Sequence, residues 1–394
     1  MSRGSTEGPT LQTAVDLHNA GRLEDAVAVY RQLAKTRLSV GVAGNLGRAL
    51  YDLGQYPESE TWLGLAARNK AGDAGLRFSL GHAYAAQGKI ELAELEYRTA
   101  LVLQPDYPQA TVALAGLYLS VGRFAEGWPL MEARVGLNSG VIPDGPASIP
   151  QWTGEPVSGK SILVCLEQGF GDQIQLCRFA ATLKARGAAR VTLCCRPPLV
   201  ALFEALPDVD AVISVAPNIA VAVGTHDYWT RYFSLPHHLG ITLETLPAAP
   251  YIAAPADRRP AWRGFSGVGL CWQVSVTGVN GKNKALPPDQ ARRLLDLGCV
   301  SLHPEDTGAT DFADTAAILE QLDLVISVDT SVAHLAGAMG RPCWTLVPGV
   351  LTDWRWMRAG TSSPWYPSMK LYRQAGGEDW SRVVGLVAAD LQAR

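Results

Sequence analysis

The sequence predicts an α-solenoid followed by an α/β fold of two Rossmann-like halves. In the first third of the chain, glycines recur with a period of 33 or 34 residues. From Ser161 onward, short apolar runs alternate with amphipathic helical stretches, as in parallel sheets with crossover helices. A length of 394 residues also exceeds one typical domain of roughly 150 residues. We expect a repeat domain at 1–135, a linker at 136–157, and the two halves at 158–255 and 256–394.

Composition and charge exclude several classes of protein. With 47% hydrophobic residues, 18% charged residues and a net charge of -3, the chain is typical of folded globular proteins and lacks the positive charge of a nucleic-acid binder. No apolar run reaches the roughly 18 residues of a membrane span, and the polar N-terminus MSRGSTEGPT has no signal-peptide core. The 7 cysteines are odd in number and show no CxxC spacing, which indicates reduced core thiols. We therefore expect a cytoplasmic protein.

The helical period is marked by Gly21, Gly54, Gly88 and Gly122, which lie 33, 34 and 34 residues apart. The four units resemble tetratricopeptide repeats and predict a short right-handed solenoid. We expect its concave face to hold an extended peptide of a partner protein; the alternative is a helical bundle that only supports the rest of the chain. The third unit carries the pattern best, with Leu80, Gly81, Tyr84, Gly88, Ala93, Tyr97, Ala100 and Pro105.

The α/β part begins after the segment LNSGVIPDGPASIP, whose glycine, proline and polar residues indicate a linker. Strands are predicted at SILVCL, RVTLCC and DAVISV in the first half and at GVGLCW, CVSLHP, LDLVISVD and PCWTLV in the second. A helix is expected from about Gly171 to Gly187. Ligands bind outside the carboxyl ends of such strands. The expected site therefore lies in the loops after Leu166, Trp272, Leu302 and Val328.

The first of these loops reads EQGFGD and ends at Asp172. A dinucleotide fingerprint fails here, because Ile174 stands where a third glycine is needed and Arg196 follows the second strand where an acidic residue is expected. The glycines instead predict close approach of a substrate. Asp172 is either a helix N-cap, which the local pattern favours, or a general base.

The second prominent stretch is DTSVAHLAGAMG, which follows a wholly apolar strand. Asp329 ends the strand, while Thr330 and Ser331 can cap a helix whose first amides would bind phosphate oxygens. His334 shares a helix face with Thr330; the alternative is a capped helix with an interior histidine. Lys282 and Lys284, in a loop rich in glycine and asparagine, can neutralise a diphosphate or simply be solvated.

No metal site is expected. Asp208 and Asp210 form a DxD pattern, but LPDVDAVISV is typical of a turn that leads into a strand. His237 and His238 lack companions at the spacing of metal ligands.

Six stretches of the chain form a combination found in a known family: EQGFGDQIQLCRFA, FSLPHHLG, GVGLCW, DFADTAAILEQLDLVISVDTSVAHLAGAMGRPCWTLVP, DWRWM and SPWYPSMKLYRQ. Together they resemble the glycosyltransferase domain that many bacteria fuse to tetratricopeptide repeats. That domain is similar to the heptosyltransferases, family 9-like enzymes of the GT-B fold. The resemblance implies a metal-independent, inverting transfer of a sugar from a nucleotide-activated donor, which binds mainly to the C-terminal half, with no cofactor.

The resemblance also implies roles for individual residues. The family's glycine-aspartate pair after the first strand matches Gly171 and Asp172, which makes Asp172 the catalytic base. Lys284 resembles a heptosyltransferase lysine before a Trp-Pro pair, although here Ala285, Leu286 and Pro287 follow. Relatives show Trp-x-Gly-Asn where this chain has Trp272, Gln273, Val274 and Ser275. The implied donor-binding set is Gln273, Lys284, Asp329, Thr330, Ser331 and His334, and the implied acceptor side is Gln168, Gly169 and Gly171.

The resemblance further implies a protein acceptor modified on Ser or Thr and recruited by the repeats. Flagellin is one case, because some flagellin-modifying enzymes have this layout and use nonulosonic acid donors. Two alternatives remain open: a non-catalytic scaffold or chaperone that binds its partner through the repeats, and a sugar-nucleotide epimerase on the same two-lobed fold.

Overall fold

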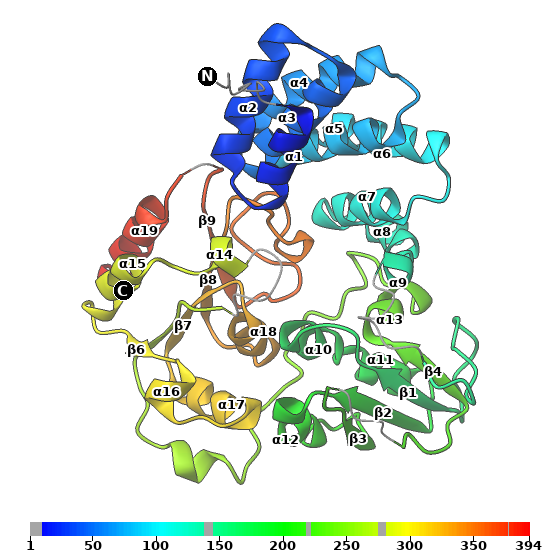
Figure 1. The fold of residues 1–394 in the computed structure, drawn as a ribbon. Helices are drawn as coiled ribbons and strands as arrows, with labels where there is room; N and C mark the ends of the chain where they lie inside the picture. The colour runs from blue at the N-terminus through cyan, green and yellow to red at the C-terminus, as the bar shows by residue number, and fades with distance from the viewer. Residues whose placement is uncertain (1–9, 138–144, 218–221, 275–280, 377) are drawn as a thin grey trace, which may run out of the picture. The chain divides into compact units, whose positions relative to one another are not determined.

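A computed structural model describes residues 10–137, 145–217, 222–274, 281–376 and 378–394. The chain divides into two compact units, Met1–Leu117 and Tyr118–Arg394 (Figure 1). This division lies earlier than the expected end of the repeats at residue 135. Phe124 and Trp128 from the last repeat helix are fully buried against aromatic rings of the α/β half, which explains the difference.

The first unit consists of paired helices with short turns. Within it α1 packs on α2, α3 on α4 and α5 on α6, and α2 contacts α3 as α4 contacts α5. Each pair occupies one period of the glycine pattern, so the predicted repeats are confirmed. The helices are α1 (Leu11–Asn19), α2 (Leu23–Thr36), α3 (Val40–Asp52), α4 (Tyr56–Asn69), α5 (Ala74–Ala86), α6 (Ile90–Leu103) and α7 (Pro108–Ser120), the last of which crosses the division.

The periodic glycines end the first helix of each pair. Gly21, Gly54, Gly88 and Gly122 have φ angles of 75°, 76°, 72° and 82°, in the left-handed region that L side chains rarely adopt. At Gly81 the constraint is steric instead, because a Cβ atom there would lie 2.6 Å from the ring of Tyr97. The glycine period therefore arises because each turn between paired helices needs the same backbone conformation.

The second unit begins inside α7, includes the last repeat helix and contains two parallel sheets. The first is four-stranded with the order β3-β2-β1-β4. The predicted strands β1 (Ser161–Cys165), β2 (Arg190–Cys195) and β3 (Ala211–Ser214) are confirmed, whereas β4 (Tyr228–Arg231) was not predicted. The single helix expected from Gly171 to Gly187 is broken into two, because the turn at Cys177 interrupts it. Helices of this half are α8 (Phe124–Met131), α9 (Arg134–Leu137), α10 (Phe170–Leu176), α11 (Phe179–Ala185), η1 (Pro197–Leu199), α12 (Val200–Glu204), η2 (Tyr232–Ser234) and α13 (Leu235–His238).

The second sheet is five-stranded with the order β6-β5-β7-β8-β9, and all its pairs are parallel. Its centre, β7 (Leu324–Val328), is buried at every residue. The other strands are β5 (Val268–Cys271), β6 (Val300–Ser301), β8 (Cys343–Val347) and β9 (Met369–Arg373). The helices are η3 (Arg259–Trp262), α14 (Gly281–Lys284), α15 (Pro288–Leu295), α16 (Pro304–Thr307), α17 (Phe312–Gln321), α18 (Ser331–Ala338), η4 (Trp354–Trp356) and α19 (Ser381–Gln392).

The α/β fold with two parallel sheets thus confirms the predicted fold class. Helix α10 of the first half lies against α18 of the second (Figure 1). None of the helices in the described part of the chain combines the length and the apolar character needed to cross a bilayer. All 7 cysteines are free thiols, and Cys165 and Cys271 are the two that are not fully buried.

Candidate functional site

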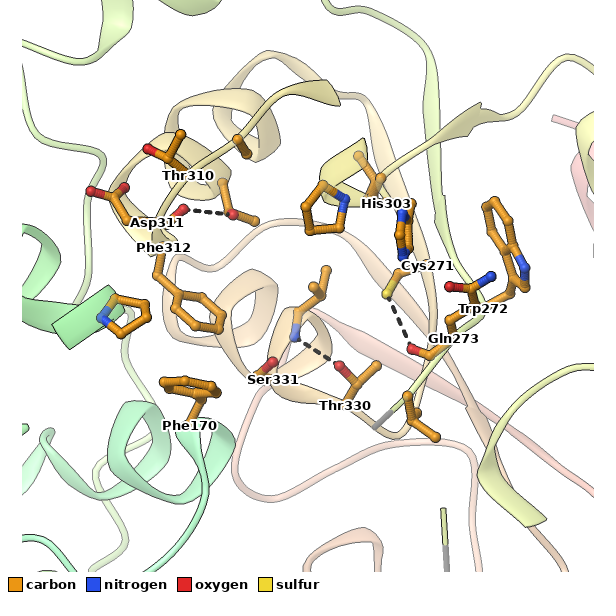
Figure 2. A pocket seen from close by; sticks show the side chains of 17 residues that line it. Phe170, Cys271, Trp272, Gln273, His303, Thr310, Asp311, Phe312, Thr330 and Ser331 are labelled. Carbon is orange, nitrogen blue, oxygen red and sulfur yellow. Dashed lines mark hydrogen bonds between the residues drawn. The ribbon is translucent and has the colours of Figure 1, made fainter. Parts of the chain in front are cut away.

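Two adjacent cavities lie at the carboxyl ends of the strands in the second unit. We name the first, of about 530 Å³, the aromatic cavity and the second, of about 470 Å³, the charged cavity. The aromatic cavity is lined by Phe170, Pro198, Cys271, Trp272, Gln273, Val274, Leu302, His303, Pro304, Ala309, Thr310, Asp311, Phe312, Thr315, Thr330, Ser331 and Val332 (Figure 2). The charged cavity is lined by Gln168, Gly169, Phe170, Gly171, Asp172, Val274, Gly281, Lys284, Asp329, Thr330, Ser331, His334, Asp353 and Arg355.

Thr330 and Ser331 line both cavities, so the N-terminus of α18 marks their junction. The Thr330 hydroxyl caps the helix, since it accepts a hydrogen bond of 3.3 Å from the Val332 amide. The helix begins here because the buried strand β7 ends at Val328 and a capping residue, Thr330, follows it. The first amides of a helix carry partial positive charge, which favours an anion at this junction.

The aromatic cavity has rings on opposite sides. Phe170 from α10 and Phe312 from α17 lie side by side, with 5.1 Å between ring centroids (Figure 2). Trp272 and Gln273 line the cavity beyond the end of β5, on the other side of His303 in the same view. Flat apolar walls with a few polar groups suit a planar, heteroaromatic ligand.

The charged cavity contains Asp172, which is the third residue of α10 and not its N-cap. Gly169 occupies the N-cap position, and its amide donates a hydrogen bond of 2.8 Å to Asp172 Oδ2. The local prediction of an N-cap at Asp172 was therefore wrong by three positions, although the carboxylate still satisfies an amide at the helix start. The other oxygen, Oδ1, pairs with the guanidinium of Arg355. Burial raises the pKa of Asp172, and Arg355 opposes that rise.

Arg355 is a site residue that the sequence did not single out. Its guanidinium also binds Asp353, with Nη1 2.8 Å from Oδ2. Although burial acts against the charged form, Asp353 and Asp172 raise the pKa of Arg355, so it stays a fixed cation. The DWRWM stretch entered only through the resemblance, because an arginine among tryptophans has no local pattern that distinguishes a site from a packed surface. The structure thus adds Asp353 and Arg355 to the candidate site.

Lys284 pairs with a buried carboxylate and is not simply solvated. Its Nζ lies 2.7 Å from Asp329 Oδ2, and the Asp329 side chain is only 5% exposed. Burial raises the pKa of Asp329, whereas Lys284 lowers it. Lys284 therefore brings a positive charge to the same cavity that receives the N-terminus of α18.

His334 is buried beneath the charged cavity. Its Nδ1 lies 2.9 Å from the Tyr366 hydroxyl, and its ring stacks on Trp356 at a centroid distance of 5.2 Å. Burial lowers the pKa of His334 to about 3, so the ring is neutral near pH 7. The residue is both a satisfied interior histidine and part of the cavity wall.

The structure explains the glycine at position 171 differently from the sequence. A Cβ atom at this position would lie 2.7 Å from Cδ2 of His334. The glycine therefore permits close approach of α10 and α18, while the sequence had suggested close approach of a substrate. The two halves therefore lie in close contact beside Asp172.

The remaining predicted residues divide between the two cavities and other places. Gln168 and Gly169 line the charged cavity, Gln273 lines the aromatic cavity, and Ser275 lies outside the described residues. Asp210 lies at a turn, where it accepts the Val191 amide at 2.7 Å and pairs with Lys184. Within the described ranges, no three His, Cys, Asp or Glu side chains converge as metal ligands would.

Comparisons with known proteins find similarity in two separate parts of the chain. Residues 271–347 match the model of glycosyltransferase family 9 (heptosyltransferase), and residues 11–74 and 78–132 match a tetratricopeptide repeat model. Protein FlbA of Caulobacter vibrioides (strain ATCC 19089 / CIP 103742 / CB 15) is 26% identical over 443 residues, which cover 96% of this chain and 72% of FlbA.

Solved structures similar to the chain include two repeat proteins. MamA (residues 41 to the end) from Desulfovibrio magneticus RS-1 is 21% identical with a TM-score of 0.29, over 33% of this chain and 72% of that one. The OM64 TPR domain of Arabidopsis is 20% identical with a TM-score of 0.26, over 27% of this chain and 88% of that one. The chain thus carries repeats similar to tetratricopeptide repeats, and its residues 271–347 are similar to glycosyltransferase family 9.

Proposed function

We propose that the protein transfers a sugar from a nucleotide-activated donor to a Ser or Thr hydroxyl of a protein acceptor. The observation that carries this proposal is the junction of the two cavities at Thr330 and Ser331. A nucleotide base suits the aromatic cavity, and its phosphates would then reach the N-terminus of α18. The sugar would occupy the charged cavity, beside Asp172.

The leaving nucleotide needs positive charge, and the chain supplies it from its own groups. The first amides of α18, the Thr330 and Ser331 hydroxyls and the Lys284 ammonium all line the charged cavity. Fixed dipoles and charges of this kind stabilise a departing phosphate without reorganisation during the reaction. We propose a metal-independent transfer on this ground, and we expect excess EDTA to leave the transfer rate unchanged.

Asp172 is the proposed base for the acceptor hydroxyl. Its carboxylate would take the hydroxyl proton while the hydroxyl oxygen attacks the anomeric carbon and the bond to the nucleotide breaks. Burial raises the pKa of this carboxylate, and Arg355, from the opposite half of the α/β fold, opposes that rise and orients the carboxylate. A single attack opposite the leaving group inverts the anomeric configuration, which NMR of the product would report.

The acceptor proposal rests on the repeats. Tetratricopeptide arrays bury one face of each helix pair and leave a groove for an extended peptide. The resemblance to flagellin-modifying enzymes makes flagellin the first acceptor to test and a nonulosonic acid the first donor. The repeats would raise the local concentration of acceptor hydroxyls near the charged cavity.

Intact-mass spectrometry of flagellin co-expressed with the protein, in a host that makes the sugar nucleotide, tests the function. We expect a sugar-sized mass increase with the wild-type chain and none with Asp172→Asn. Asp208→Asn is the matched control, because it neutralises an aspartate at a turn away from both cavities and should leave the modification intact. Full modification by Asp172→Asn would remove this carboxylate from the mechanism.

A non-catalytic scaffold is the second candidate function, and one observation favours it. Lys284 and Asp172 already have ionic partners within the protein, which a donor would have to share or displace. Calorimetric titration with a panel of nucleotides and nucleotide sugars separates the two functions. A glycosyltransferase binds one of them, whereas a scaffold binds none and carries its partner without changing the partner's mass. Turnover of the donor without any acceptor would instead indicate an epimerase.

A further inference from the structure

A buried ion pair connects the end of the repeats to the loop that carries Asp172. Arg134, the first residue of α9, places Nε 3.0 Å from Oε2 of Glu167 and Nη2 3.0 Å from Oε1. Both side chains are almost fully buried, with 2% and 1% exposed. Arg134 also donates to Ser234 Oγ at 3.0 Å and to Glu132 Oε1 at 2.8 Å, so its guanidinium is held from several sides.

Glu167 lies directly between β1 and the cavity loop. The residues that follow it, Gln168 and Gly169, line the charged cavity, and the Gly169 amide binds Asp172. Glu167 Oε1 also accepts the Phe233 amide at 2.7 Å, which ties the same carboxylate to the segment after β4. A carboxylate fixed in this way sets the direction in which the loop leaves the sheet.

Phe233 extends the connection to the other side of the site. The Arg134 guanidinium lies 5.6 Å from the centre of the Phe233 ring, and the Arg355 guanidinium lies 5.2 Å from it. One ring therefore packs against both the arginine that holds Glu167 and the arginine that holds Asp172. Trp128 of α8 makes a second contact of this kind. Its ring meets the ring of Trp354 edge-on, with 5.3 Å between the ring centroids, and Trp354 precedes Arg355 in the chain.

We propose that Arg134 is a positioning residue of the transfer reaction, which sets Asp172 against Arg355 by holding Glu167 and Phe233. It touches neither cavity and acts through these two residues. This inference rests on the proposed function for its catalytic part, while the effect on the loop stands independently of it. Its chemical logic is that a base displaced by about 1 Å can lose about 100-fold in rate while substrate binding survives.

The test compares three variants of the full chain. Arg134→Met alone leaves Glu167 buried and unpaired, so it is expected to impair folding. The double variant Arg134→Met, Glu167→Leu replaces both charges with apolar groups of similar size, a change that buried ion pairs often tolerate. Arg134→Lys keeps the charge but loses the two-point contact. Lys184→Met is the matched control, because it breaks an ion pair at the amino end of the same sheet.

Two readouts are measured on each folded variant. Hydrogen exchange followed by mass spectrometry reports on the peptide 166–176, where the double variant should lose about 10-fold or more of its protection while the control does not. Transfer kinetics with the acceptor identified by intact mass should show kcat about 100-fold lower and KM for the donor within about 3-fold of wild type. Arg134→Lys should recover part of both.

The pH profile separates positioning from general stability. Burial raises the pKa of Asp172, while Arg355 and the Gly169 amide lower it, so moving the buried carboxylate away from Arg355 should shift the acid limb of kcat to higher pH in the double variant. A folded double variant with wild-type loop protection, kcat and acid limb overturns the proposal. If the wild-type chain transfers no sugar, the proposed function has failed, and the exchange of 166–176 alone then decides whether Arg134 holds the loop.

Discussion

At the scale of single residues, the site depends on a contact between Gly171 and His334. The glycine allows α10 to approach α18 beside Asp172, while Tyr366 and Trp356 hold the histidine ring in place. A neutral, hydrogen-bonded ring gives a firm surface without adding charge to a cavity that already contains three carboxylates, Asp172, Asp329 and Asp353. Gly171 and the ring of His334 therefore determine how closely the two halves of the α/β fold can approach each other.

Gly171→Ala is expected to reduce transfer strongly. The added methyl would meet Cδ2 of His334 at 2.7 Å, so α10 and α18 must separate by several tenths of an ångström. We expect a loss of about 10-fold to 100-fold in kcat, because Asp172 moves with α10. Steady-state kinetics measure the loss, and Gly64→Ala in α4 is the control. Wild-type kcat in Gly171→Ala would contradict the role given to this contact.

The acidity of Asp172 predicts the pH dependence of transfer. A base acts when deprotonated, and burial raises its pKa above the ordinary 3.8, so activity should fall with decreasing pH at a higher pH than an exposed aspartate would give. Removing the opposing cation in Arg355→Met should move this acid limb higher still. Profiles of kcat against pH check both directions, and an acid limb that moves lower in Arg355→Met would exclude Asp172 as the group observed.

At the scale of elements, the repeat unit depends on the turns between paired helices. The same left-handed backbone recurs at Gly21, Gly54 and Gly88, and no neighbouring atom lies within 4 Å of a Cβ built at any of them. A side chain there would have room, so the cost of a substitution comes from the backbone alone. The left-handed backbone at the turn thus lets the chain pass from one helix of a pair to the next, and packing between the two helices stabilises the pair.

Gly88→Ala and Gly64→Ala should change stability in opposite directions. Gly88 has φ 72°, so alanine there is expected to lower the free energy of unfolding by about 1 kcal/mol. Gly64 lies inside α4, where alanine is expected to raise it by about 0.5–1 kcal/mol. Urea unfolding of the two variants measures both changes. Equal and unchanged midpoints would show that the turn conformation carries no such cost.

At the scale of the whole molecule, the position of the boundary between the two compact units, after Leu117, has consequences for stability. Helices α8 and α9 belong to the repeats by sequence, yet Trp128 and Arg134 are buried among residues of the α/β half. The turn at Gly122, which leads into α8, has the same left-handed backbone as the earlier turns, and the match to the repeat model ends at residue 132. Their packing partners come from residues more than 30 positions away, which a repeat pattern does not report.

Two truncated chains test this boundary. A fragment of residues 118–394 keeps Trp128 and Arg134 and should unfold cooperatively with a Tm near that of the α/β unit in the full chain. A fragment of residues 136–394 leaves Glu167 buried without its cation, which costs about 3–5 kcal/mol. Thermal unfolding followed by circular dichroism compares them. Equal Tm values for the two fragments would show that α8 and α9 contribute nothing to the α/β unit.

Much of the fold was predictable because its signals are local. The glycine period, the apolar runs of β1, β2 and β7, and the capping residues before α18 each depend on near neighbours in the chain. The short strand β4 was missed because Tyr228–Arg231 has only four residues and ends in an arginine, so its pairing with β1 decides its conformation.

The candidate site divides in the same way. Local sequence indicated Asp172, Lys284 and the start of α18, since each follows a strand or begins a helix where ligands bind. Tertiary structure alone paired Asp172 with Arg355, brought Lys284 to Asp329 and placed Arg134 on Glu167. Ion pairs between distant residues depend on distance and burial in three dimensions, and neither quantity is encoded in the spacing of residues along one segment.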